Sequence, residues 1–142
     1  MGEDAMISQG FHIGERDWYV MCYYDVHTEE ELGEVYKTLL ASGCPDFKAR
    51  EACMVLSQKN TGFTFTNFKE HLTVVFVGES TDAGQAYDTV QHELRHVTDH
   101  ICEYYDVDPT SEEASYLQGE VARNMFTATS MLFCPRCGKI GK

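Results

Sequence analysis

The sequence predicts an α+β fold in a single domain over residues 1–142, and three segments carry that prediction. Residues 72–78 are apolar and β-branched, which is typical of a strand. Apolar residues then recur at helical spacing over 83–105 and again from 114 to 133. A chain of this length, 43% hydrophobic, can bury a sizeable core. We therefore expect a small antiparallel sheet packed against two long consecutive helices.

The N-terminal half of the chain supplies scaffold elements. Residues 18–25 are rich in aromatic side chains, which favours a strand. Thr28 and Glu31 have the spacing of a capping box and open a predicted helix that runs through Leu40. Gly43 follows at the position where a left-handed residue commonly ends a helix. This half is expected to position a site, not to contain it.

A second helix and a hairpin are predicted between residues 46 and 78. Residues 46–58 have a helical apolar face, and residues 63–66 alternate as a strand does. A short polar turn connects that strand to the one at 72–78, which makes a hairpin. The helix at 83–105 follows the hairpin, and three side chains before it can cap its first turn: Ser80, Thr81 and Asp82.

The motif His92-Glu93-Leu94-Arg95-His96 lies in the middle of this predicted helix. Side chains at positions i and i+4 share one helix face, so both imidazoles can reach one metal ion. Glu93 projects about a quarter-turn away and can contact a water molecule on that metal without binding the metal itself. Zinc accepts such ligands and keeps one position open in catalytic sites. The spacing predicts zinc ligands at His92 and His96 and a general base at Glu93.

A third zinc ligand is expected from the next helix. Its start at residues 108–114 combines a proline, two hydroxyls and acids. A helix running antiparallel to the first can present a carboxylate to the two imidazoles. The candidate acids are Glu112, Glu113 and Glu120. At least two of the three must instead belong to a charged helix start or a solvated face.

The HExxH motif followed by this acidic helix start resembles the gluzincin pattern, in which a Glu from the next helix completes the site. The chain is similar in particular to small HExxH proteins of bacteria and their phages. Those proteins share a hairpin before the motif and an acid-x-x-x-Tyr-Leu-x-Gly run after it. That run is matched here by Glu112, Tyr116, Leu117 and Gly119. The resemblance, over residues 61–133, implies a zincin-like, minimal gluzincin fold, with Glu112 as third ligand and Glu113 as the next choice.

Two comparisons limit this resemblance. Gluzincins usually carry an Asp four residues after the ligand Glu, and Tyr116 stands at that position. The rival metzincin pattern requires a Gly three residues after the second His and a His or Asp six residues after it, where this chain has Asp99 and Cys102. Without that Gly the helix is expected to continue, so that Cys102 points away from the metal. Two roles are open for Asp99, His100 and Glu103. They form an outer shell around the metal ligands, or they belong to a polar face of the helix.

These residues predict a zinc-dependent metallopeptidase that cleaves a peptide or protein substrate with a zinc-activated water. Glu93 would take the proton of that water and pass it to the leaving amine. One strand of the hairpin, at 63–66 or 73–77, is a candidate for binding the peptide along its edge. The alternative is that both strands simply cover the core. Two alternatives stay open. One is a catalytically inactive zincin-like binding or assembly protein, and the other is a helical domain whose HExxH motif binds no metal.

Charge and composition bear on partners and location. The net charge of −12 disfavours binding to nucleic acid or to anionic membranes. The first residues are acidic and lack the basic and apolar segments of a secretory signal. We therefore expect a cytoplasmic protein with neither a nucleic-acid nor a membrane partner.

The six cysteines fall into two groups. Four lie in or beside apolar or helical segments and are expected to be reduced: Cys22, Cys44, Cys53 and Cys102. The other two, in Cys134-Pro-Arg-Cys137-Gly138, have the spacing of a zinc-ribbon knuckle. A ribbon needs a second pair, and none lies nearby in the chain. Cys134 and Cys137 are therefore candidates for binding metal with a partner chain or for closing a small redox loop.

Overall fold

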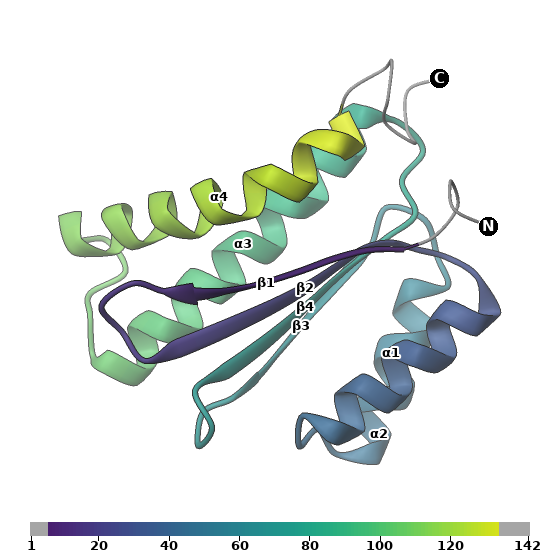
Figure 1. The fold of residues 1–142 in the computed structure, drawn as a ribbon, viewed down its shortest axis with the longest axis horizontal. Coiled ribbons are helices and arrows are strands. Elements are labelled where there is room, and N and C mark those ends of the chain that lie inside the picture. The colour runs from purple at the N-terminus through teal and green to yellow at the C-terminus, as the bar shows by residue number, and fades with distance from the viewer. Residues whose placement is uncertain (1–5, 134–142) are drawn as a thin grey trace.

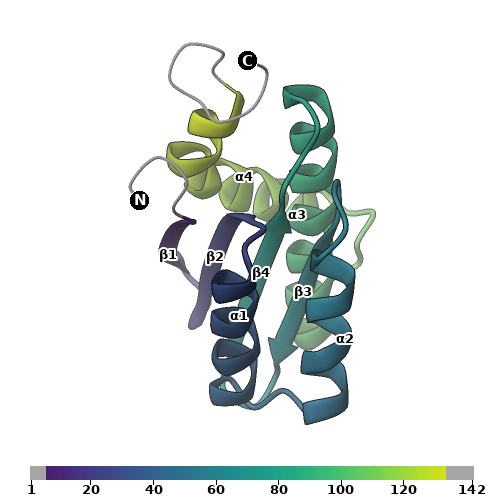
Figure 2. The ribbon, with the colours of Figure 1, turned by 90° about the vertical axis from the view of Figure 1, so that its right-hand side faces the viewer.

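The computed structural model describes residues 6–133, which form a four-stranded sheet between two pairs of helices (Figures 1 and 2). In chain order the elements are β1 (Ile7–Ile13), β2 (Trp18–Val26), α1 (Glu29–Ala41), α2 (Asp46–Leu56), β3 (Gly62–Asn67), β4 (Leu72–Gly78), α3 (Ala83–Tyr105) and α4 (Glu112–Phe133). The α+β class predicted from the sequence is confirmed. Each element expected from periodicity is present, and β1 is an additional strand that the sequence did not predict.

The sheet is mixed, with strand order β1-β2-β4-β3. The pairs β1–β2 and β3–β4 are antiparallel, whereas the central pair β2–β4 is parallel. The expectation of an antiparallel sheet is therefore wrong for the central pair. The reason is that α1, α2 and β3 intervene between β2 and β4, and such a crossover returns the chain in the same direction. As a result β3 lies at an edge of the sheet, paired only with β4.

A separate hydrophobic core fills each side of the sheet. On one side, α3 and α4 pack on a core that contains the fully buried Trp18 and Tyr24. On the other side, α1 and α2 cover a smaller core built around Phe76 and Leu39. Figure 2 shows the two helix pairs on opposite faces of the strands. On the first side, α3 lies over β3 and β4, and α4 lies beside α3 over β1.

Local signals in the sequence set the helix ends where they were expected. Thr28 caps α1 through a capping box, accepting a hydrogen bond from the Glu31 amide at 3.0 Å. Gly43, just after α1, has a φ of +94°, a conformation that favours glycine. Asp82, one of three predicted caps of α3, accepts a hydrogen bond from the Gln85 amide at 2.8 Å. The start of the motif helix is therefore fixed by its own sequence.

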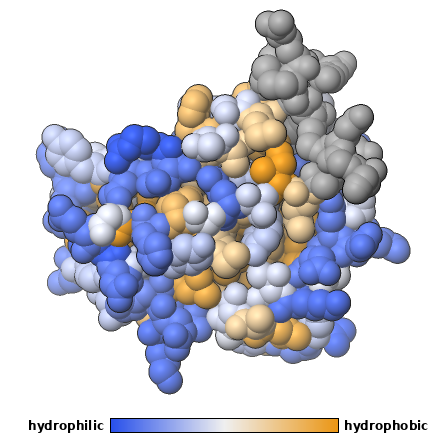
Figure 3. All heavy atoms as spheres, in the orientation of Figure 1, coloured by the Kyte–Doolittle hydropathy of each residue, from blue (hydrophilic) through white to orange (hydrophobic). Residues whose placement is uncertain are grey.

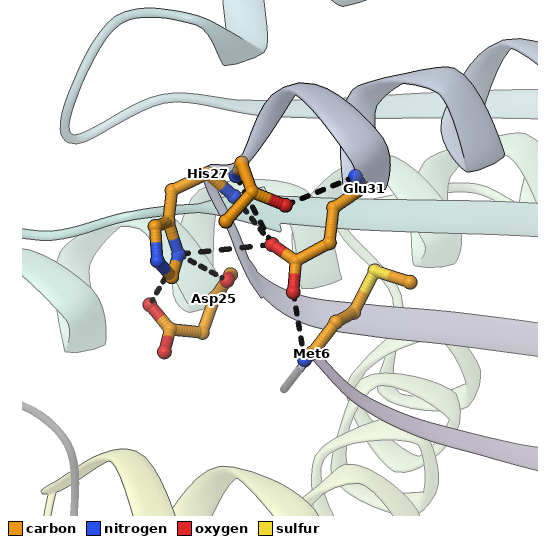
Figure 4. Close-up of polar contacts among 5 residues, drawn as sticks. Met6, Asp25, His27 and Glu31 are labelled. Carbon is orange, nitrogen blue, oxygen red and sulfur yellow. Dashed lines mark hydrogen bonds and ion pairs between the residues drawn. The ribbon is translucent and has the colours of Figure 1, made fainter. Parts of the chain in front are cut away.

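A polar cluster joins the end of β2 to the start of α1 (Figure 4). The Glu31 carboxylate accepts hydrogen bonds from the backbone amides of Met6 at 3.0 Å and of His27 at 2.9 Å. The imidazole of His27 donates from Nδ1 to the carbonyl of Asp25 at 2.9 Å. Asp25 is buried and has a φ of +65° where the pairing of β2 with β4 shifts register. The cluster ties β1, β2 and α1 together at one end of the sheet.

The charges of this cluster shift two pKa values. Burial acts to lower the pKa of His27, but the Asp25 carbonyl and the carboxylates of Asp25, Glu31 and Glu79 outweigh it and raise that pKa. Burial acts to raise the pKa of Glu31, but the backbone amides and the imidazole of His27 outweigh it and lower that pKa. The carboxylates around His27 therefore favour the protonated form of its imidazole.

Residues 6–133 bear on two further predictions, the reduced cysteines and the absence of a membrane partner. Cys22, Cys44, Cys53 and Cys102 are all free in this part of the chain, as expected for reduced thiols. Cys134 and Cys137 lie outside the described residues. In that same part of the chain, no helix has the length and apolar character needed to span a membrane.

Candidate active site

The two motif imidazoles lie together on the solvent side of α3. The helix buries one stripe of residues, including Val90, Leu94 and Val97, so His92 and His96 fall on the exposed face. Their Nε2 atoms are 3.2 Å apart. Two nitrogens that each bind a tetrahedral zinc ion at about 2.0–2.1 Å lie about 3.3 Å from each other. The observed spacing therefore fits chelation of one zinc ion by the two Nε2 atoms.

Glu93, between these histidines, is turned toward β3 and is almost completely buried, with 3% of its surface exposed. The Thr64 hydroxyl donates a hydrogen bond to its Oε1 at 2.6 Å. Burial raises the pKa of Glu93, opposed by the Thr64 hydrogen bond and by His92 and His96. Such a carboxyl group accepts a proton more readily than an exposed one, which is the property a general base needs.

Gly62 makes room for the buried carboxylate. A Cβ atom at position 62 would lie 2.6 Å from Oε2 and 2.7 Å from Cγ of Glu93. Both separations are shorter than any normal van der Waals contact, so a larger residue at position 62 would displace the Glu93 side chain. The first residue of the edge strand is therefore part of the site.

His92 and Glu93 open into the same hollow, of about 310 Å³, between α3 and the beginning of β3. Its lining includes the edge strand at Gly62 and the polar side chains of Asp88 and Thr89. An extended peptide that paired with β3 would pass along this hollow, because the outer side of an edge strand is open to a further strand. The predicted base and one predicted zinc ligand thus face a common space beside an edge strand.

The structure separates the three candidate carboxylates of α4. The Arg16 guanidinium pairs with Glu113, and Glu120 accepts a hydrogen bond from the Gly14 amide at 2.7 Å. Both acids line a hollow of about 570 Å³ beside the β1–β2 turn. That end of the molecule is hydrophilic in Figure 3, on the left. Glu113 and Glu120 are therefore engaged by the β1–β2 turn, while Glu112 is exposed on the first turn of α4.

Within residues 6–133, no three His, Cys, Asp or Glu side chains are grouped so as to hold a metal ion. The structure brings His92 and His96 together and does not bring Glu112 into a group with them. The geometric reason is that α3 continues from His96 to Tyr105, about 13 Å at about 1.5 Å per residue, before the chain turns into α4. The role of Glu112 as third ligand stays a prediction.

His100 extends the row of imidazoles one turn beyond His96, at a ring-centroid distance of 6.0 Å. Its Nδ1 lies 2.7 Å from the hydroxyl of Thr66 on β3. Burial lowers the pKa of His100, and the neighbouring His96 adds to that effect. Asp99 instead accepts a hydrogen bond from Arg95 on the helix surface. Of the polar residues considered for an outer shell, His100 is thus the one joined to the edge strand.

Sequence reasoning treated Thr64 and Thr66 only as strand formers. Alternation in β3 places Gly62, Thr64 and Thr66 on the same side of the strand, and Glu93 and His100 lie seven residues apart on one side of α3. The alternating Phe-Thr pattern was the signal available for this shared face. No pattern among neighbouring residues indicates that this face of β3 packs against α3.

Comparisons with family models, with curated proteins and with solved structures found no match to this chain.

Proposed function

We propose that this chain is a zinc-dependent metallopeptidase with a zincin-like arrangement of its motif helix and edge strand. The observation that carries the proposal is the 3.2 Å separation of the His92 and His96 Nε2 atoms. It is supported by Glu93, which opens into the same hollow as His92. A pair of imidazoles with a carboxylate between them beside an edge strand is suited to metal-assisted peptide hydrolysis.

Each residue has a distinct role in this proposal. His92 and His96 would hold the zinc ion, and the gluzincin resemblance implies Glu112 as the third ligand, although the structure does not group Glu112 with the two histidines. Zinc when bound would lower the pKa of a water molecule and polarise the scissile carbonyl. Glu93 accepts the proton of the attacking water and returns it to the leaving amine. The Thr64 hydroxyl, 2.6 Å from Oε1, positions the carboxylate of Glu93 for both transfers.

The substrate in this proposal is an extended peptide bound along β3. An edge strand offers main-chain hydrogen bonds that do not depend on the substrate sequence. β3 lies at the edge of the sheet, and its first residue, Gly62, lines the hollow. A peptide that adds to β3 would therefore bring a carbonyl group near His92 and Glu93. The free thiols at four described cysteines suit the reducing cytoplasm, where we place the protein.

The test combines metal content with peptide hydrolysis. Zinc per chain is measured by native mass spectrometry for the wild type, His92→Ala and Glu93→Gln, with His12→Ala on β1 as a control histidine. We expect about one zinc ion in all but His92→Ala. Glu93→Gln should retain zinc but cleave a fluorogenic casein substrate at least about 100-fold more slowly than the wild type.

Two outcomes would redirect the proposal. Zinc retained by His92→Ala would assign the metal to Cys134 and Cys137 instead. A zinc-loaded wild type that cleaves no peptide would favour the alternative of a catalytically inactive binding or assembly protein. Protein that binds no zinc even after reconstitution would contradict the proposed function.

A further inference from the structure

A chain of hydrogen bonds runs from the core of the protein to His100. The indole Nε1 of Trp18 on β2 lies 2.9 Å from the hydroxyl of Thr73 on β4. The Thr73 hydroxyl lies 2.9 Å from that of Thr66 on β3, and the Thr66 hydroxyl lies 2.7 Å from Nδ1 of His100 on α3. Trp18 and Thr73 are completely buried and Thr66 is 9% exposed, so solvent has little access to these groups.

The chemistry of these groups sets the direction of every bond in the chain. An indole N–H can only donate, so Thr73 accepts from Trp18. The Thr73 hydroxyl hydrogen then needs an acceptor, because a buried donor without one is strongly unfavourable. Among the described residues that acceptor is the hydroxyl oxygen of Thr66. The hydrogen of Thr66 is therefore directed to Nδ1 of His100.

This direction fixes the protonation pattern of the imidazole. Since Nδ1 accepts a hydrogen bond, it carries no proton, and the proton of the neutral ring is on Nε2. The Nε2–H group is on the other ring nitrogen and is not the group that bonds Thr66. A ring held in this way is a donor with a fixed direction and not a metal ligand. This separates His100 from His92 and His96, although all three recur at four-residue spacing.

We propose that His100 contacts the substrate, donating from Nε2–H to the peptide carbonyl oxygen that becomes the oxyanion during hydrolysis. The inference rests on the proposed peptidase function and adds to it a donor beside the metal. His100 is half-buried, one helical turn beyond His96, and is bonded to the edge strand along which the peptide would lie. A preorganised donor aimed at developing negative charge stabilises a transition state more than it stabilises the substrate.

The first experiment reads the tautomer in zinc-free protein and does not depend on activity. Two-bond proton–nitrogen correlation spectra of protein with ¹⁵N-labelled histidine distinguish the Nε2–H from the Nδ1–H form. We expect Nε2–H for His100 in the wild type and a mixture in Thr66→Val, because valine cannot direct a proton to Nδ1. Thr64→Val, which alters the same face of β3 but not this chain, should leave the His100 tautomer unchanged. An Nδ1–H form in the wild type would overturn the inference.

The second experiment measures whether the Nε2–H group of His100 contributes to catalysis. In zinc-loaded protein we expect His100→Ala to lower kcat on fluorogenic casein by about 100-fold with zinc content unchanged. His100→Gln should recover part of that loss, since its amide N–H can donate, whereas a merely structural role would not be rescued. Unchanged kcat in His100→Ala would overturn the donor role and leave the peptidase proposal standing. A zinc-loaded wild type without activity would overturn both, and the tautomer would still show whether the hydrogen-bonded chain exists.

Discussion

Replacing Gly62 by alanine tests how tightly the edge strand holds the candidate general base. The added Cβ would lie 2.6, 2.7 and 2.8 Å from Oε2, Cγ and Cδ of Glu93. The conflict reaches Cγ, near the root of the side chain, so moving only the carboxylate end does not remove it. Glu93 is also packed in the interior, with 3% of its surface exposed. The alanine variant therefore has to displace Glu93 from Thr64.

The free-energy cost follows from the contacts that are lost. A hydrogen bond to a charged acceptor contributes about 1.5–3 kcal/mol to stability. Forcing an extra methyl group into a packed site costs about 1–3 kcal/mol. Because the side chain relaxes partly toward the hollow, we expect Gly62→Ala to lower the free energy of unfolding by about 2–4 kcal/mol. This corresponds to a decrease in Tm of roughly 6–12 °C for a chain of this size.

Urea unfolding followed by circular dichroism measures the effect in two backgrounds. Alone, Gly62→Ala should show the full penalty, whereas in a Glu93→Ala background the penalty should fall below about 0.5 kcal/mol, because the clashing side chain is gone. Gly119→Ala is the matched control: the position lies in α4, nothing lies within 4 Å of a built Cβ there, and alanine should stabilise the helix by about 0.5–1 kcal/mol. Equal penalties for Gly62→Ala in both backgrounds would refute the reasoning.

Two further predictions concern the start of α1. Thr28→Ala removes the N-terminal cap of α1 and should lower the free energy of unfolding by about 1 kcal/mol in urea titrations. Ser42→Ala, at the C-terminal end of α1, is the variant with which this loss is compared. The pKa of His27 is raised from its ordinary value of 6.5, so its protonated form stabilises the fold. That stabilisation should be fully present below about pH 6.5 and should be lost as the pH rises through the raised pKa. The difference in stability between the wild type and His27→Gln should therefore shrink from pH 6 to pH 8, and a constant difference would contradict the assignment.

The structural features that could be predicted from the sequence are those that depend only on residues close together in the chain. The apolar periodicity of α3 and the Thr28–Glu31 capping box depend on neighbours within one or two helical turns, so they could be recognised directly. The pairing of β2 with β4 depends instead on which segments meet across the fold. The strand β1 was not predicted, because Gly10 interrupts it and most of its side chains are exposed or half-buried. Both features weaken the sequence pattern of a strand.

The same distinction holds within the site. His92 and His96 are four residues apart on one helix, so their 3.2 Å approach could be anticipated from helical geometry alone. The burial of Glu93 against β3 and the bond of His100 to Thr66 involve residues separated by 29 and 34 positions in the chain. The prediction for Glu112 had to assume how α4 crosses α3, and that crossing is set by packing that local patterns do not encode.

The edge strand supports the site at two points that act independently. Glu93 lies against Gly62 and Thr64, and His100 lies against Thr66. From the middle of the first pair to Thr66 the strand rises about 10 Å, which matches the rise of about 10.5 Å between Glu93 and His100 along α3. The strand and the helix therefore run side by side through the site.

Because the two supports share no partner, the penalties of Thr64→Val and Thr66→Val should add. Thr64→Val removes the donor to a carboxylate and should cost about 1.5–3 kcal/mol, and Thr66→Val leaves a buried Thr73 hydroxyl without its acceptor and should cost about 1–3 kcal/mol. Urea unfolding of both single variants and the double variant measures the sum. Additivity within about 0.5 kcal/mol is expected for sites without common contacts. A larger coupling would mean that β3 shifts as one unit, so that the positions of Glu93 and His100 depend on each other.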